Sequence, residues 1–223
     1  KIELVGDPKF DGLQPANNDD KVRLRKIFKL EENTPLWIAG STHAGEEEIV
    51  LDAHLRLRKI YPNLVLILAP RRIERVSDIS ALLDKKNISF CRRSLLNNSL
   101  PKSVILLDTM GELAGVYSMS KVAFIGCSLI EPGGGHNLME PLANGAAVLH
   151  GPYIENIGHV ADEAHKQGLA FTVNNAEDIC KKVHAFLEQK EHDRDFAEKA
   201  KSFFENQKGA AKKLALIVLE TFN

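Results

Sequence analysis

The chain has 223 residues, of which 44% are hydrophobic and 26% charged, and its formal net charge is −1 at pH 7. This composition allows a sizeable core and excludes disordered and fibrous proteins. Because basic residues are not in excess, no overall field draws the chain to nucleic acid or to an anionic membrane surface, so any charged ligand must be bound by a local arrangement of residues.

The cysteine pattern favours a reducing compartment, and the apolar runs argue against a membrane span. Cys91, Cys127 and Cys180 are an odd number without CxxC spacing, which argues against a disulfide framework or a zinc site. No apolar run approaches the roughly 20 residues of a membrane span, and there is no signal-peptide pattern. We therefore expect a soluble chain in a cytoplasmic setting.

In chain order, residues 1–6 read as a strand already under way, as in a fragment of a longer protein, and the polar residues 17–20 as a loop before a first helix. Short apolar runs then alternate with amphipathic stretches, and a charged run at 189–194 is expected to be solvated. The predicted strands are residues 35–39, 64–69, 89–91, 104–107, 122–125, 147–150 and 170–173. The predicted helices are residues 46–61, 73–86, 111–118, 137–144, 156–167, 176–189 and 193–222.

Several of these strands are apolar at nearly every position, as expected where both faces of a parallel sheet are covered. Repeated strand–helix units predict an α/β fold, a doubly wound parallel sheet with right-handed crossovers. Ligands of such sheets bind at the carboxyl ends of the strands, so the loops that follow the strands are the candidate functional segments.

The first of these loops begins Gly40-Ser41-Thr42-His43 and leads into a glutamate-rich helix. Gly40 permits a sharp turn, and the start of the helix offers unpaired N–H groups and a positive dipole end that suit a phosphate. A plain capping box, with Thr42 as the cap and a glutamate of the first turn as its partner, is an equally good interpretation.

The second strand ends in a proline followed by two arginines. An arginine at the carboxyl end of a strand offers a planar fork of donors to phosphate or carboxylate, so Arg71 is a candidate ligand contact. Arg72 and Arg75 are expected to pair with Glu74 or Asp78 instead.

The third loop is Asp108-Thr109-Met110-Gly111-Glu112-Leu113, and a helix is expected to begin near its glycine. Backbone groups around residues 110–113 can face a bound base or phosphate at close range. The alternative is that Asp108 or Thr109 simply caps the helix.

The fourth loop carries the strongest signal, the run Gly133-Gly134-Gly135-His136-Asn137 with Glu140 one turn later. Three consecutive glycines cost backbone entropy, and close approach of the backbone to an anion supplies a reason for them. Neither GxGxxG nor GxxxxGK[ST] spacing is present. Glu140 can accept from ribose hydroxyls and His136 can donate to an oxyanion; otherwise Glu140 only favours the helix start and His136 is a structural hydrogen-bonder.

Other polar residues carry weaker signals. His43, His150, His159 and His165 are scattered without ligand spacing, and no metal site is predicted. Ser128 has no GxSxG elbow around it, so Ser–His hydrolase chemistry is poorly supported, and the neighbouring Cys127 is expected to pack near the strand end.

Taken together, these loops resemble the Kdo (3-deoxy-D-manno-octulosonic acid) transferases of lipid A and lipopolysaccharide assembly. The resemblance runs from about residue 6 to residue 183, with Leu138-Met139 and the extra Gly133 as departures that leave the polar residues in place. The matching motifs are Gly40-Ser41-Thr42-His43, Pro70-Arg71, Asp108-Thr109-Met110-Gly111-Glu112-Leu113 and Gly134-Gly135-His136-Asn137-x-x-Glu140-Pro141, with Asp7-Pro8-Lys9-Phe10-Asp11 and Gly151-Pro152 as weaker matches.

The resemblance implies the C-terminal half of a GT-B glycosyltransferase, a single Rossmann-like domain over residues 1–223 that binds CMP-Kdo. It also implies that the missing N-terminal domain holds the lipid A precursor acceptor, the general base and the membrane contact, at the cytoplasmic face of the bacterial inner membrane. This half alone is then expected to be inactive. No cofactor, metal or nucleic acid partner is implied.

For catalysis, the resemblance implies inverting transfer in which Arg71 and N–H groups near Ser41 and residues 134–137 stabilise the leaving CMP. Glu140 then holds the ribose and the backbone near residues 110–113 recognises the cytosine. Two alternatives stay open: a GT-B transferase or epimerase that uses a UDP-sugar, and a non-catalytic nucleotide-binding module.

Overall fold

The computed structural model describes residues 7–98, 101–188 and 193–221. Its centre is a seven-stranded sheet in the order β3-β4-β2-β1-β5-β6-β7, and all paired neighbours run parallel. The predicted doubly wound parallel sheet is confirmed, whereas the strand expected at residues 1–6 lies outside the described residues. The strands are β1 (Leu36–Thr42), β2 (Val65–Pro70), β3 (Phe90–Arg92), β4 (Val104–Leu106), β5 (Val122–Ile125), β6 (Ala147–His150) and β7 (Ala170–Thr172).

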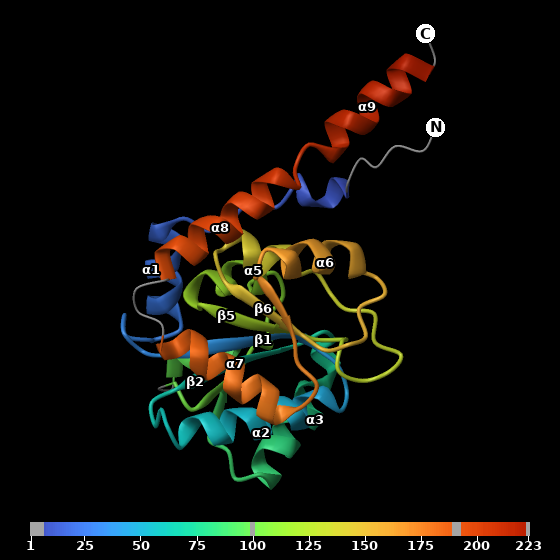
Figure 1. Ribbon diagram of the computed structural model, residues 1–223. Helices are drawn as coiled ribbons and strands as arrows, with labels where there is room; N and C mark the ends of the chain where they lie inside the picture. The colour runs from blue at the N-terminus through green and yellow to red at the C-terminus, as the bar shows by residue number, and fades with distance from the viewer. Residues whose placement is uncertain (1–6, 99–100, 189–192, 222–223) are drawn as a thin grey trace.

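Helices cover both faces of this sheet, as Figure 1 shows. One face packs against α2 (Glu46–Arg58), α3 (Val76–Lys85) and α7 (Ala176–Glu188). The other face packs against α1 (Asn18–Ile27), α4 (Leu113–Val116), α5 (Met139–Ala143), α6 (Gly158–Lys166) and α8 (Asp193–Asn206). The described residues also form short 3-10 helices: η1 (Pro8–Phe10), η2 (Ile73–Arg75), η3 (Arg93–Asn98) and η4 (Tyr117–Met119).

The strands are apolar along their length because successive side chains enter two different cores. In β1, Ile38 points into the core beneath α1, α4 and α5, whereas Trp37 and Ala39 point into the core beneath α2 and α3. All three side chains are fully buried. Burial on both faces therefore replaces the alternating polar pattern of a half-exposed strand.

The C-terminal segment differs from the single helix predicted over residues 193–222. It forms α8 and then α9 (Ala210–Thr221), which extends away from the body of the domain in Figure 1. The break falls at Gly209, whose φ of 97° lies in the left-handed region, and the Asp11 carboxylate accepts from the N–H groups of Gly209 (2.5 Å) and Ala211 (2.8 Å). Asp11 therefore caps α9.

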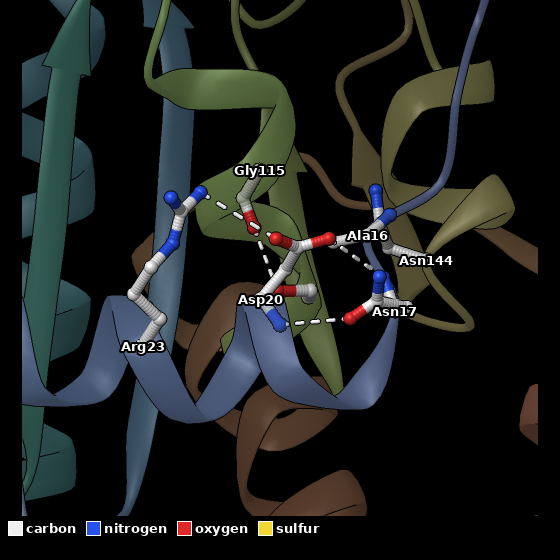
Figure 2. Close-up of polar contacts among 7 residues, drawn as sticks. Ala16, Asn17, Asp20, Arg23, Gly115 and Asn144 are labelled. Atoms are coloured by element: carbon white, nitrogen blue, oxygen red, sulfur yellow. Dashed lines mark hydrogen bonds and ion pairs between the residues drawn. The ribbon is translucent and has the colours of Figure 1, made fainter.

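The polar stretch at 17–20 is also not a loop, because α1 begins at Asn18. Figure 2 shows its capping box: the Asp20 N–H donates to Asn17 Oδ1 (2.9 Å) and the Asn17 N–H donates to Asp20 Oδ2 (3.2 Å). Beside it, Asn144 Oδ1 accepts from the Ala16 N–H (3.0 Å). This asparagine also donates to Glu140 O, so it ties α5 to the segment that leads into α1.

The strand order places a topological switch between β1 and β5. From β1 the chain builds β2, β3 and β4 on one side, and it then returns to build β5, β6 and β7 on the other. Loops that leave the carboxyl ends of β1 and β5 diverge at such a point and open the crevice in which ligands of parallel sheets bind. The first and fourth candidate loops are those two loops.

None of the helices in the described part of the chain combines the length and the apolar character needed to span a membrane.

Candidate functional site

The first candidate loop begins inside β1, which runs to Thr42 and is irregular at Ser41. Ser41 has a φ of 56°, and the pairing register between β1 and β2 shifts at this point. Gly40 has a different role from the predicted sharp turn, since a Cβ there would lie 2.0 Å from the buried Tyr117 hydroxyl and 3.4 Å from Leu113 Cδ1. The glycine therefore lets the Tyr117 ring and the third candidate loop approach β1.

Thr42 does not cap the following helix. The cap of α2 is Gly45, with no side-chain hydrogen bond to the helix, and Thr42 is fully buried with a hydroxyl that finds no partner within the described residues. The capping-box interpretation is thus wrong for its threonine. A glutamate of the first turn does bond to the loop, however, because the Glu46 carboxylate accepts from the His43 N–H at 2.8 Å.

Glu46 joins the loops after β1 and β5. Besides His43, its carboxylate accepts from the N–H groups of Cys127 (2.8 Å), Ser128 (2.8 Å) and Leu129 (2.9 Å). The residue is only 1% exposed, and four N–H donors replace the water that its charge has lost. Sequence reasoning missed this role, because it gave the glutamates at the start of α2 at most a local capping bond and no contact with the loop after β5.

Arg71 stands at the end of β2 with its backbone tied to the first loop. Its N–H donates to Thr42 O (3.0 Å), its side chain is exposed, and it is close enough to His136 to lower the pKa of that ring. The expectation for Arg75 is wrong: it forms a forked pair with the buried Glu47 (2.5 and 3.0 Å), not with Glu74 or Asp78. Arg71 and Arg72 are both exposed at this strand end, and Arg71 is the candidate ligand contact because its charge acts on His136.

In the third loop, the acidic side chains are already engaged. Asp108 accepts from the N–H (2.9 Å) and the hydroxyl (2.6 Å) of Ser94, so it does not cap α4. Glu112 pairs with Arg93 (2.7 Å) and accepts from the Thr109 hydroxyl. Gly111 has a φ of 79° and Met110 is 83% exposed, so backbone groups and the Met110 side chain remain accessible here.

The glycine turn uses three left-handed residues in a row. Gly133, Gly134 and Gly135 have φ values of 59°, 112° and 78°. Added Cβ atoms would lie 2.2 Å from Tyr153, 2.2 Å from Asn156 and 2.6 Å from Ile157, respectively. Glycine is therefore required here both by φ and by the segment that packs behind the turn.

Two N–H groups of this turn donate within the protein, which leaves fewer of the predicted N–H donors for a bound anion. The Gly134 N–H donates to Tyr153 O (3.1 Å) and the Gly135 N–H donates to Cys127 O (2.6 Å). The expectation that N–H groups across residues 134–137 face an anion is thus wrong for the two glycines. The N–H groups of His136 and Asn137 remain as the candidate donors at this turn.

Glu140 lies in the first turn of α5, half-buried, and accepts from Asn137 Nδ2 at 3.2 Å. Burial raises the pKa of its carboxyl group, and the Asn137 bond opposes that shift. The carboxylate keeps acceptor capacity for a further partner, since a carboxylate offers about four lone-pair directions.

The structure brings together two histidines that are far apart in sequence. His43 Nε2 and His136 Nε2 are 2.9 Å apart. Burial, followed by the neighbouring His43 and Arg71, lowers the pKa of His136 to about 4, so this ring is neutral at pH 7. Cys127 lies beside them at the end of β5, as expected, and its thiol donates to Gly133 O (2.9 Å). The scattered appearance of His43 in the sequence was therefore misleading.

Other singled-out residues lie outside this cluster. Ser128 is fully buried, donates to Ile125 O (2.6 Å) and accepts from the Gly151 N–H (2.8 Å). These bonds indicate a structural residue and argue against a nucleophile. His150 is buried and its Nε2 lies 2.8 Å from His165 Nε2, and neither ring belongs to the group of His43, Cys127 and His136. A hollow of about 570 Å³ lies near the amino ends of the strands, and no predicted site residue lines it.

Comparisons with known proteins agree with this architecture. The family glycosyl transferases group 1 matches residues 49–203. A 3-deoxy-D-manno-octulosonic acid transferase of Haemophilus influenzae is 40% identical over 199 residues, which are 86% of this chain and 45% of that protein. A bifunctional glycosyltransferase/methyltransferase of Fusobacterium nucleatum is 35% identical over 212 residues, 93% of this chain and 32% of that protein.

Among solved structures, the C-terminal CMP-Kdo binding domain of WaaA from Acinetobacter baumannii superposes with a TM-score of 0.75 at 30% identity. The match covers 83% of this chain and 96% of that domain. The chain thus spans about a third to a half of the curated relatives and nearly the whole of this crystallised domain.

Proposed function

Because the chain belongs to the glycosyl transferases of group 1, and among them to the Kdo transferases, we propose that it binds CMP-Kdo for the transfer of Kdo to a lipid A precursor. The observation that carries the choice of donor is the similarity to the CMP-Kdo binding domain from Acinetobacter baumannii. In this proposal, residues 1–223 form one donor-binding domain of a GT-B enzyme.

In the proposed reaction, the bond between the anomeric carbon of Kdo and a phosphate oxygen of CMP breaks, and its electron pair stays on the phosphate. A donor aimed at that oxygen lowers the barrier, since the negative charge grows in the transition state. The exposed guanidinium of Arg71 fits this role. The N–H groups of His136 and Asn137, at the glycine turn, fit a second contact to the same phosphate.

The nucleoside is assigned to the remaining loops. Glu140 has spare acceptor capacity and lies one turn beyond Asn137, which suits ribose hydroxyls. At residues 110–113 the Glu112 carboxylate is held by Arg93, so recognition of the cytosine falls to backbone groups near Gly111. Ser41, with its left-handed backbone, is proposed to contact the phosphate from the β1 side.

The other functions needed for the proposed reaction are assigned to the segment that the relatives have and that this chain does not span. We assign to it the general base, the acceptor surface for the lipid A precursor and the contact with the cytoplasmic face of the inner membrane. Inversion at the anomeric carbon is part of the same proposal. This chain alone is then expected to bind CMP weakly and to transfer no Kdo.

Calorimetric titration with CMP tests the proposal. Arg71→Ala should weaken CMP binding at least tenfold, because a charge-assisted hydrogen bond of about 1.5–3 kcal/mol is lost. Arg72→Ala is the matched control, since Arg72 is an exposed neighbour at the same strand end, and its affinity should stay unchanged. Glu140→Ala should also weaken CMP binding and leave the circular dichroism spectrum intact.

Three outcomes would change the assignment. Tight binding of UDP with no response to CMP favours a transferase or epimerase that uses a UDP-sugar. Equal CMP affinity in the wild type and in Arg71→Ala removes this arginine from the site. Kdo transfer by the chain alone contradicts the proposed division of labour and favours a complete active site in this domain.

A further inference from the structure

Three side chains with metal-binding atoms meet between the loops after β1 and β5. His43 comes from the first loop, Cys127 from the end of β5 and His136 from the glycine turn. One ligand atom of each lies within 4.8 Å of the other two, and the two Nε2 atoms are 2.9 Å apart. All three residues are partly exposed, so a cation can reach them from solvent.

The backbone holds these three residues in place without any ligand. The N–H groups of His43 and Cys127 both donate to the buried Glu46 carboxylate (2.8 Å each). Cys127 has a left-handed φ of 60°, and its carbonyl accepts from the N–H of Gly135, the residue before His136. One carboxylate and one short backbone bond therefore fix all three segments relative to one another.

We propose that His43 Nε2, Cys127 Sγ and His136 Nε2 form a three-ligand site for a zinc-class divalent cation. In a tetrahedral zinc site, with Zn–N near 2.0 Å and Zn–S near 2.3 Å, the ligand atoms are about 3.3–3.7 Å apart. Small side-chain rotations reach that spacing from the arrangement described here. Two imidazoles and a thiolate favour zinc, cobalt or copper over magnesium and calcium.

Metal binding replaces hydrogen bonds of these three side chains by bonds to the cation. The Cys127 thiol gives its proton to the buffer, and the thiolate replaces its hydrogen bond to Gly133 O by a bond to the metal. Each imidazole keeps one proton on Nδ1 and turns its Nε2 lone pair to the cation, so the bond between the rings is exchanged for two metal bonds. The fourth coordination position stays open to water or to an oxygen of a bound molecule, as in catalytic zinc sites.

Cobalt titration of the reduced, metal-free chain tests this site directly. Binding of one Co²⁺ per chain should produce a thiolate-to-cobalt charge-transfer band together with the intense visible bands of a four-coordinate ion, and Zn²⁺ should displace it. Cys127→Ser should abolish the charge-transfer band. Cys180→Ser is the control and should keep it, because Cys180 lies on α7 outside the cluster. His43→Ala and His136→Ala should each weaken binding at least tenfold.

An absent charge-transfer band in the folded wild type overturns the site, as does a band that survives Cys127→Ser or disappears in Cys180→Ser. In the first case the two histidines are a hydrogen-bonded pair only. Circular dichroism of each variant separates loss of the site from loss of the fold. This test is independent of the proposed function, since CMP titration in the presence of a chelator examines the nucleotide site with the metal removed.

Discussion

At the scale of single residues, Glu46 is the residue of the site whose burial needs the most compensation by hydrogen bonds. A buried carboxylate costs several kcal/mol unless hydrogen bonds replace its hydration. Four backbone N–H groups do so here, one from the first loop and three from the fourth. The residue therefore works as a support for both loops and has no remaining capacity for a ligand.

Glu46→Gln should destabilise the fold and disturb the site together. The amide keeps one oxygen acceptor and places an NH₂ group against N–H donors, so at least two of the four donors lose their partner. We expect the free energy of unfolding to fall by roughly 2–4 kcal/mol, measured by urea denaturation. Glu48→Gln is the matched control because Glu48 is exposed on the same turn of α2 and should change stability by less than about 0.5 kcal/mol. A Glu46→Gln chain as stable as the wild type contradicts this role.

At the scale of elements, the glycine turn and the short helix α5 behave as one unit. The turn is backed by the segment before α6, where Asn156 donates its N–H to Gly134 O (2.9 Å). Asn144 holds the other end of α5 through Glu140 O (2.9 Å) and Ala114 O (3.1 Å). The position of Glu140 therefore depends on contacts at both ends of this unit.

Gly134→Ala should displace the turn. A Cβ would lie 2.2 Å from Asn156 Nδ2, and the φ of 112° is one that alanine adopts only under strain. We expect a loss of about 1–3 kcal/mol of stability in thermal unfolding and a loss of CMP binding in the proposed site. Gly158→Ala provides the comparison, because a Cβ at Gly158 meets nothing within 4 Å and the residue opens α6. Equal stability of the two variants contradicts the constraint on the turn.

Local patterns predicted the sheet and its loops well, because each buried strand carries its own apolar run. The strands at 122–125 and 147–150 match β5 and β6 at both ends. Helix limits were less accurate: the split between α8 and α9 depends on Asp11, about two hundred residues earlier in the chain.

Long-range polar partners were not predictable from spacing. The Arg75–Glu47 pair and the meeting of His43 with His136 both arise only when separate loops converge at the sheet edge. Sequence patterns indicate which loop carries polar residues, and the three-dimensional fold decides which of them turn toward one another. The supporting role of Glu46 was missed for the same reason.

At the scale of the whole molecule, a buried histidine links stability to pH. His54 on α2 accepts from Trp37 Nε1 (3.2 Å), and its Nε2 lies 3.0 Å from Ser103 O, so the ring joins α2 to β1 and to the start of β4. Burial, reinforced by Arg58, lowers its pKa from 6.5 to about 3. The ring is therefore neutral in the folded state over the whole range in which an unfolded histidine gains a proton.

Stability should fall as the pH falls through this window. Above about pH 6.5 neither state protonates His54, and between pH 6.5 and 3 only the unfolded state does, so protons favour unfolding. We expect His54 to account for about 2 kcal/mol of lost stability between pH 7 and pH 5, measured by urea denaturation at each pH. His54→Gln should flatten this dependence, whereas His159→Gln, at an exposed position, should not. An unchanged slope in His54→Gln contradicts the assignment.

The adjacency of β1 and β5 also has a kinetic consequence. Ile38 pairs with Ala123, so this contact closes a long loop at a cost in chain entropy, and such long-range pairings form slowly. Glu46 finds its partners at residues 127–129 only after that closure. A refolding chain will thus regain helical signal before it regains the convergence of the two loops, and the return of ligand affinity will mark the last stage of assembly.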